Sequence, residues 1–260
     1  MPNFFAPGNA EILVLLFARV GGLVMIAPMF TSKAIPVSLK TAITVLLTLL
    51  LHPLASAASN GAIPRITPET FLGETLVGFG LGLGAALLVG ASSVAGELMG
   101  VQVGLSGAAV LDPVNNTQGN VLGTFTNLFA ITLLFAVDAH LVMIDAIGKS
   151  LNVIVLGSGL HAAGMLAMVK TGSVLFGLGL QFAAPVIAAV LVGNTALAIL
   201  SRAAPQLNLF SVAFPIQIGI GLTALAAAIP FIGAFYHGWT GVYNSTLDRV
   251  FHALTHGGAI

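Results

Sequence analysis

Four ionisable residues lie close together on one apolar segment. Asp138, His140, Asp145 and Lys149 all fall within FAVDAHLVMIDAIGKS at 135–150. On a helix, the two aspartates and the lysine lie close to one face, and Asp145 and Lys149 have the i,i+4 spacing of an ion pair. Ionisable residues in membrane segments are candidates for function, and two interpretations stay open: a proton relay and hydrogen bonding between helices. We favour hydrogen bonding, because the segment ends near Lys149.

The sequence carries no recognisable enzyme or metal-binding motif. Its six histidines include one His-x-x-x-His pair, His252 and His256, but alanine follows the first of them where the zinc-protease motif His-Glu-x-x-His has glutamate. The chain has no Glu-x-x-His pair and no cysteine for a thiolate metal site. No serine has the G-x-S-x-G setting of a hydrolase nucleophile. The run GFGLGLG does not fit the dinucleotide-binding pattern. We therefore expect a protein that is not an enzyme and that uses no cofactor or metal.

Two polar stretches interrupt the apolar sequence. The first, LDPVNNTQGN at 111–120, follows the glycine-containing GLSGAA at 104–109, and its Asp-Pro and Asn-Asn pairs favour turns. It is either a solvated connection between helices or a mobile loop lying in a pore. The second, SRAAPQLNLFSVAFP at 201–215, places an arginine, two amides and two prolines between apolar segments. It is either a well-capped turn or a docking element.

Composition places these stretches in a membrane protein. Charged residues make up 6% of the 260 residues, eight basic and eight acidic, whereas about 25% is usual in a soluble domain. So few charges could not cover a soluble globule of this size, which excludes a soluble enzyme. The zero net charge also excludes a basic surface for nucleic acid.

The apolar segments predict helices that cross or enter a bilayer, within a single domain over 1–260. A crossing takes about 20 apolar residues, and the segments lack the period-two alternation of strands. Arg19 lies in the middle of the first, at a cost of about 3 kcal/mol, so we expect it to find a partner or an aqueous face. The predicted helices lie near residues 10–30, 36–57, 70–103, 120–148, 168–201 and 211–239.

Glycine and proline indicate that these helices pack against other helices. Gly96, Gly100 and Gly104 recur every four residues, and the run 78–84 repeats this spacing, which allows helix backbones to approach closely. Proline tends to kink or end a helix, and in a membrane the freed carbonyls must be satisfied by protein or by water in a cavity. Prolines fall within or beside apolar runs at Pro28, Pro36, Pro185, Pro215 and Pro230.

Four motifs stand out along the chain: RVGGLVMIAPMFTSKAIPVSLK at 19–40, GVQVGLSGAAVLDPVNNTQGN at 100–120, FAVDAHLVMIDAIGKS at 135–150 and SRAAPQLNLFSVAFPIQIGIGL at 201–222. Together they resemble the type III export-gate family FliR/SctT, with greatest overall likeness to its flagellar branch. They occur in the order and spacing of that family, in a chain of its length. Two positions depart from the family pattern: Ala213 replaces an expected glycine, and Gln217 stands where many relatives have a basic residue.

The resemblance implies an all-α, multi-helix membrane-type protein with kinked helical hairpins, which assembles into a helical export-gate complex. One such subunit combines with several copies of FliP and FliQ homologues, beside FlhB and FlhA homologues, in contact with membrane lipid. The complex forms a closed channel for unfolded flagellar export substrates. The implied location is the bacterial inner membrane at the flagellar basal body, with much of the assembled gate on the periplasmic side.

The resemblance also implies site residues. The loop after the third helix of the family contributes to a pore plug, and its small and apolar residues suit a narrow lumen. The plug positions are Leu105, Ser106, Gly107, Ala108, Ala109, Val110, Leu111, Asp112, Pro113, Val114, Asn115 and Asn116. The positions expected to serve helix packing and assembly are Gly96, Gly100, Gly104, Arg202, Pro205, Gln206, Asn208, Phe214 and Pro215.

The alternative interpretation is a small-molecule secondary transporter. Such a protein is expected to contain paired broken helices in two related halves. The sequence offers only a loose likeness between Ile-Ala-Pro at 26–28 and Ala-Ala-Pro at 183–185.

Overall fold

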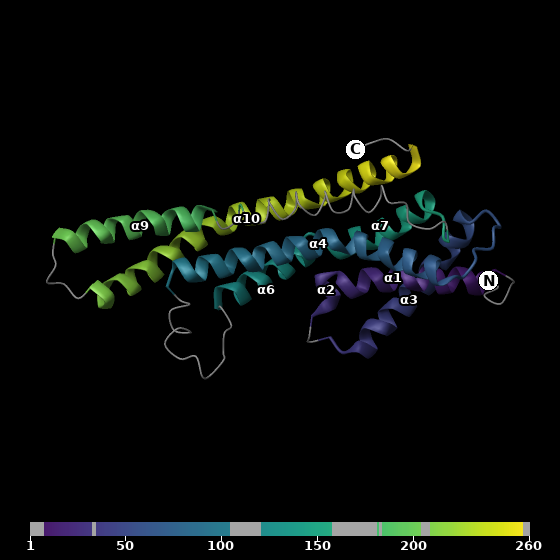
Figure 1. Ribbon diagram of the computed structural model, residues 1–260, viewed down its shortest axis with the longest axis horizontal. Helices are drawn as coiled ribbons and strands as arrows, with labels where there is room; N and C mark the ends of the chain where they lie inside the picture. The colour runs from purple at the N-terminus through teal and green to yellow at the C-terminus, as the bar shows by residue number, and fades with distance from the viewer. Residues whose placement is uncertain are drawn as a thin grey trace. The chain divides into compact units, whose positions relative to one another are not determined.

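The computed structural model describes residues 8–32, 35–104, 121–157, 181, 184–203 and 209–256, and every regular element in these ranges is a helix (Figure 1). This confirms the predicted all-α class. The helices are α1 (Asn9–Ile26), α2 (Pro28–Thr31), α3 (Val37–Ala58), α4 (Pro68–Gln102), α6 (Val121–Ala136), α7 (Ala139–Val153), α9 (Ala184–Ala203) and α10 (Leu209–His256).

Several of these helices are long and apolar enough to cross a membrane. Among the described residues they are α1, α3, α4 and the part of α10 from Pro215 to Ser245, with α6 and α7 as a fifth if that bent pair forms one span. The multi-helix membrane character predicted from composition is therefore confirmed.

The predicted first helix over 10–30 is in fact two helices, because Pro28 divides it. A residue before proline is forced away from helical dihedral angles, and Ala27 accordingly has φ −64° and ψ 124°. The helix α1 ends at Ile26, and Pro28 then occupies the first position of α2, where its missing N–H costs nothing.

The predicted fourth helix over 120–148 is also two helices. The described elements α6 and α7 meet at an angle of 64° across a break at residues 137–138. Asp138 precedes α7 with φ 54° and ψ 28°, a left-handed conformation that aspartate adopts more readily than most residues. The apolar pattern runs through the break, which is why the sequence did not reveal it.

The prolines of the last helix do not end it. Pro215 and Pro230 both lie inside α10, which continues to His256 instead of ending near residue 239 as predicted. Both prolines are exposed, so each ring lies on the outer side of the helix. Pro185 is the second residue of α9, within the first turn where proline is tolerated.

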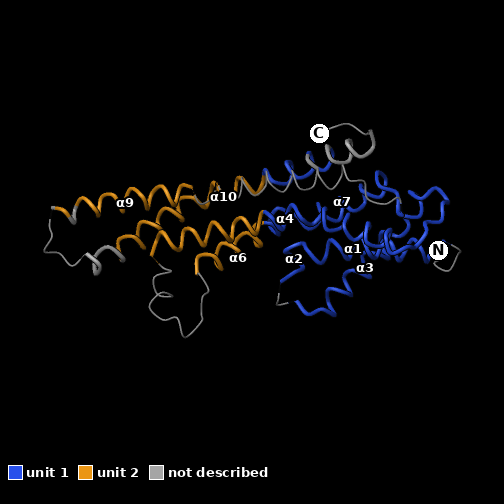
Figure 2. The backbone as a smooth tube through the Cα atoms, viewed as in Figure 1, with its two compact units in different colours: residues 1–87, 134–174, 238–260 blue, residues 88–133, 175–237 orange. Residues whose placement is uncertain are grey.

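The chain forms two compact units, each built from separate stretches of sequence (Figure 2). Unit 1 contains residues 1–87, 134–174 and 238–260, and unit 2 contains residues 88–133 and 175–237. The expectation of a single domain over 1–260 stays a prediction. The helices α4, α6 and α10 each contribute residues to both units.

Unit 1 is built around α1, which packs against α3, while α3 in turn packs against α7. Within the C-terminal part of α10, which belongs to this unit, the rings of Trp239 and Tyr243 stack with 4.9 Å between their centroids. The Tyr243 hydroxyl donates a hydrogen bond of 2.6 Å to the Leu81 carbonyl of α4. The buried apolar side chains of the unit include Leu15, Leu16, Leu23, Met143 and Ile147.

Unit 2 has an apolar core to which α4, α6, α9 and α10 all contribute. A neutral side-chain hydrogen bond links α4 and α10 in this unit: the hydroxyls of Ser92 and Tyr236 lie 3.0 Å apart. The core is formed by Ala95 and Met99 of α4, Val103 directly after α4, Leu122 of α6, Val186 and Val190 of α9, and Leu225 of α10.

Candidate functional site

The glycines of unit 1 bring the backbones of α1 and α4 into direct contact. A Cβ atom added at Gly22 would strike the Thr75 carbonyl, and one added at Gly78 would strike the Arg19 carbonyl. At Gly82 the added atom would meet the backbone of α1 at 3.2 Å or more and a side chain more closely still. Since no larger residue fits between these backbones, the small-residue spacing seen in the sequence does serve close helix packing here.

Gly96 provides the corresponding contact in unit 2, between α4 and α6. An added Cβ would strike the Thr126 hydroxyl and would lie 2.6 Å from the Leu122 carbonyl. Gly100, one turn further along α4, is also buried. Gly104 differs, because α4 has already ended at Gln102 and Gly104 has φ +81°. It therefore ends the helix in a left-handed conformation and does not extend the packing face.

The contact between α9 and α10 uses residues that sequence reasoning did not select. A Cβ at Gly193 would lie 2.6 Å from Cδ1 of Ile220, and the Gln217 side chain donates a hydrogen bond to the Asn194 side chain. Gln217 was noted only as a departure from a family pattern. A neutral amide at position 217 can donate to the Asn194 side-chain oxygen. The only sign of this pairing in the sequence was a second amide, Asn194, 23 residues earlier in an apolar helix.

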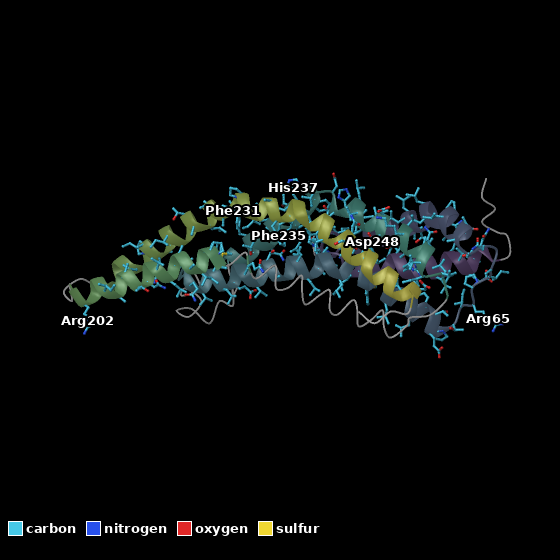
Figure 3. The ribbon with its side chains drawn as sticks, turned by 90° about the horizontal axis from the view of Figure 1, so that it is seen from above. Arg65, Arg202, Phe231, Phe235, His237 and Asp248 are labelled. Carbon is cyan, nitrogen blue, oxygen red and sulfur yellow. The ribbon has the colours of Figure 1, made fainter. Side chains whose placement is uncertain are left out.

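The second polar stretch is described only in part. Arg202 is exposed in the last turn of α9 (Figure 3), where a cation complements the negative end of the helix dipole. Pro215 is exposed on α10, and Phe214 lies in the same helix. Pro205, Gln206 and Asn208 lie outside the described residues. The docking and capping interpretations of this stretch therefore both stay predictions.

The predicted pore plug also lies outside the described residues. All of its positions, from Leu105 to Asn116, fall within 105–120, between the end of α4 and the start of α6. Its two flanking helices both contribute to the core of unit 2.

The ionisable cluster of the fourth predicted helix consists largely of exposed side chains. The Lys149 ammonium lies 2.9 Å from the Asp145 carboxylate, one turn apart on α7, and Asp138 is exposed at the break before this helix. His140 is half-buried, with its ring centroid 5.5 Å from that of Phe135. The charged pair is thus satisfied within one helix. The relay and the interhelical hydrogen bond stay predictions.

Arg19, in contrast, is fully buried and paired. Its guanidinium Nε lies 2.6 Å from a carboxylate oxygen of Glu74 on α4, and both side chains are almost wholly shielded from solvent. The expectation that Arg19 finds a partner is confirmed. The sequence did not identify that partner, because Glu74 is 55 residues away and its pairing depends on how α1 crosses α4.

No metal site is apparent in the described part of the chain: its histidines, aspartates and glutamates form no group of three or more that could hold an ion. What the described residues do present is a set of helix-packing contacts, one buried ion pair and long apolar helices. These features are consistent with a multi-helix membrane protein.

The family model for bacterial export proteins, family 1, matches residues 10–241 of the chain. The chain belongs to this family. It is 34% identical to the flagellar biosynthetic protein FliR of Pectobacterium carotovorum subsp. carotovorum, over 84% of each chain. Its identity to the FliR of Caulobacter vibrioides is 32%, over 95% of this chain and 98% of the relative, and to that of Escherichia coli it is 29%, over 89% and 90%.

Membership of the bacterial export family accounts for the fold and for the kind of function. The chain is a component of the flagellar export apparatus, works with other proteins of that apparatus, and has a membrane location consistent with its long apolar helices. Its relatives are named for flagellar biosynthesis and export, not for catalysis.

Proposed function

We propose that the chain is a structural, non-enzymatic subunit of the flagellar type III export gate, which forms a closed channel for unfolded flagellar subunits with FliP and FliQ homologues. The observation that carries this proposal is the family match over 10–241. One copy combines with several copies of each partner, beside FlhB and FlhA homologues. The gate lies in the bacterial inner membrane at the flagellar basal body, with much of it on the periplasmic side.

The distribution of apolar surface supports a subunit that is completed by neighbours. The most apolar 18-residue stretch of α10, within Pro215–Ser245, has a mean hydropathy of 2.0, yet only 17% of it is buried. In the most apolar 18-residue stretch of α4, 56% is buried. Phe231 on α10 is 77% exposed (Figure 3). An added Cβ at Gly233 would meet nothing within 4 Å, which leaves room for a closely packed helix.

Residues 105–116 are proposed to contribute to the plug of the closed channel. A pore that holds back ions must be blocked by side chains or dewetted at a constriction, and small and apolar residues at 105–111 can fill such a constriction. They can also withdraw without the loss of strong bonds. The left-handed conformation of Gly104 supports this role, because it ends the helical stretch directly before the segment.

The plug is tested by deletion of Ser106–Leu111 in cells that make the partner proteins. We expect the complex to assemble and the membrane to leak small solutes, measured as dye entry. The matched control keeps the length and composition of these six residues in shuffled order and should restore the barrier. Unchanged permeability with the deleted protein present in the assembled complex would contradict the plug role.

A further inference from the structure

The buried Arg19 guanidinium contacts three separate parts of unit 1. In addition to its contact with Glu74 on α4, Nη1 donates a hydrogen bond of 2.9 Å to the Ser150 hydroxyl on α7. Nη2 donates another, also of 2.9 Å, to the carbonyl of Ile154. Ile154 follows the last residue of α7 and has extended dihedral angles, φ −113° and ψ 93°. The planar guanidinium has five N–H donors and can therefore bind several acceptors at once.

Glu74 holds the same turn from its other side. One of its carboxylate oxygens is paired with Arg19, and the other accepts a hydrogen bond of 2.9 Å from the backbone N–H of Gly157. The turn 154–157 is therefore held at both ends: Arg19 donates to the carbonyl of its first residue, and Glu74 accepts from the N–H of its last. Gly157 has φ +81°, and a Cβ there would lie 3.0 Å from Pro64.

We propose that Arg19 and Glu74 form a polar clamp of fixed direction, whose role is to position the turn 154–157 that follows α7. An ion pair that only neutralises charge between α1 and α4 would stabilise their contact equally well with the two residues exchanged. This clamp would not, because exchange would set a carboxylate against the Ile154 carbonyl and a guanidinium against the Gly157 N–H. Both residues are positioning residues, and the proposal does not depend on the function of the gate.

The absence of cysteine from the chain allows a direct test with single thiol reporters. Leu156 lies in the turn and is only 5% exposed, whereas Met143 is fully buried in the middle of α7. Leu156→Cys reports opening of the turn, and Met143→Cys reports loss of the surrounding packing. The rate of maleimide labelling is measured for each reporter in the full-length protein, purified in mild detergent.

Each of three changes is combined with each cysteine reporter in the same protein. Glu74→Gln keeps the shape of the side chain but leaves too few acceptors for both partners, and the exchange R19E/E74R reverses the pair. As a matched control, D145K/K149D reverses an ion pair that is exposed and lies wholly within α7. Losing hydrogen bonds to a buried charged group should raise labelling at Leu156→Cys about 10- to 100-fold.

The clamp predicts faster labelling at Leu156→Cys in both Glu74→Gln and R19E/E74R, with Met143→Cys still protected and the control unchanged. Labelling at the wild-type rate in R19E/E74R would overturn the fixed direction. If Glu74→Gln left the labelling rate of Leu156→Cys the same as in the protein that carries this reporter alone, the positioning role would be overturned. If Met143→Cys were labelled as fast as Leu156→Cys in Glu74→Gln, the pair would support the whole unit and not this turn, which would also overturn the proposal.

Discussion

Unit 1 and unit 2 both pack helices closely, but they do so with different kinds of contact. In unit 1, the atoms that face Gly22 and Gly78 are backbone carbonyls, and the buried polar pair is charged. In unit 2, Gly96 also faces a backbone carbonyl, but the atoms that face Gly193 and Gly221 belong to the side chains of isoleucine and valine. The buried polar pair of unit 2 joins two hydroxyls. Because backbones cannot rotate away and buried charges cannot lose a partner cheaply, unit 1 should be the less tolerant of change.

The largest effect is expected at Gly78 of unit 1. Gly78→Ala places a Cβ against the Arg19 carbonyl, and overpacking of this kind costs about 3 kcal/mol or more. The thermal stability of the purified protein should fall by several degrees or the protein should not be recovered. The control is Gly90→Ala on the same helix, where nothing lies within 4 Å and alanine favours the helix by about 1 kcal/mol. Equal stability of the two variants would contradict the close backbone contact at Gly78.

A smaller loss is expected at Gly96 of unit 2. Gly96→Ala crowds the Thr126 hydroxyl and the Leu122 carbonyl, so we expect a cost of about 1–3 kcal/mol. This change should reduce recovery of the assembled complex. Gly100→Leu, at the next buried glycine of α4, should prevent recovery. Normal co-purification of both variants with partner proteins would show that these glycines are not needed for close packing.

A still smaller effect is expected at Gly193 of α9. The added Cβ of Gly193→Ala meets the end of the Ile220 side chain, which can change rotamer. Together with the helix preference of alanine, this limits the net change in stability to about 1 kcal/mol. Thermal unfolding of the purified variant measures it, and a loss as large as that of Gly78→Ala would contradict the view that unit 2 is adaptable.

The smallest effect is expected at the exposed charged pair of α7. Removal of both charges with D145N/K149Q should change stability by less than about 0.5 kcal/mol and should leave export of flagellar subunits unchanged. Export is measured as secreted subunit in the culture medium. A severe export defect with normal amounts of assembled protein would instead favour the proton-relay interpretation.

The sequence predicted most of the helical architecture, because long apolar runs without charge are governed by local composition. It failed at residues 137–138, where the break depends on a left-handed Asp138 inside an apolar run that gives no sign of it. It also failed at the end of α10, where exposed prolines are accommodated without ending the helix.

The candidate site shows the same division. The spacing of Gly78, Gly82 and Gly96 predicted close packing, since one helix face is visible in one stretch of sequence. The partner of Arg19 was not predicted, and neither was the role of Ser150, 131 residues away. Such contacts depend on how three helices cross, and an unaligned sequence does not contain that information in a local pattern.

The central claim is that the apolar helices of this chain are completed by other proteins of an export gate. The most direct test is coexpression with FliP and FliQ homologues, followed by purification in mild detergent and mass measurement of the intact particle. We expect one particle that contains this chain once together with several copies of each partner. A stable, solitary chain that carries a metabolite into vesicles would contradict it.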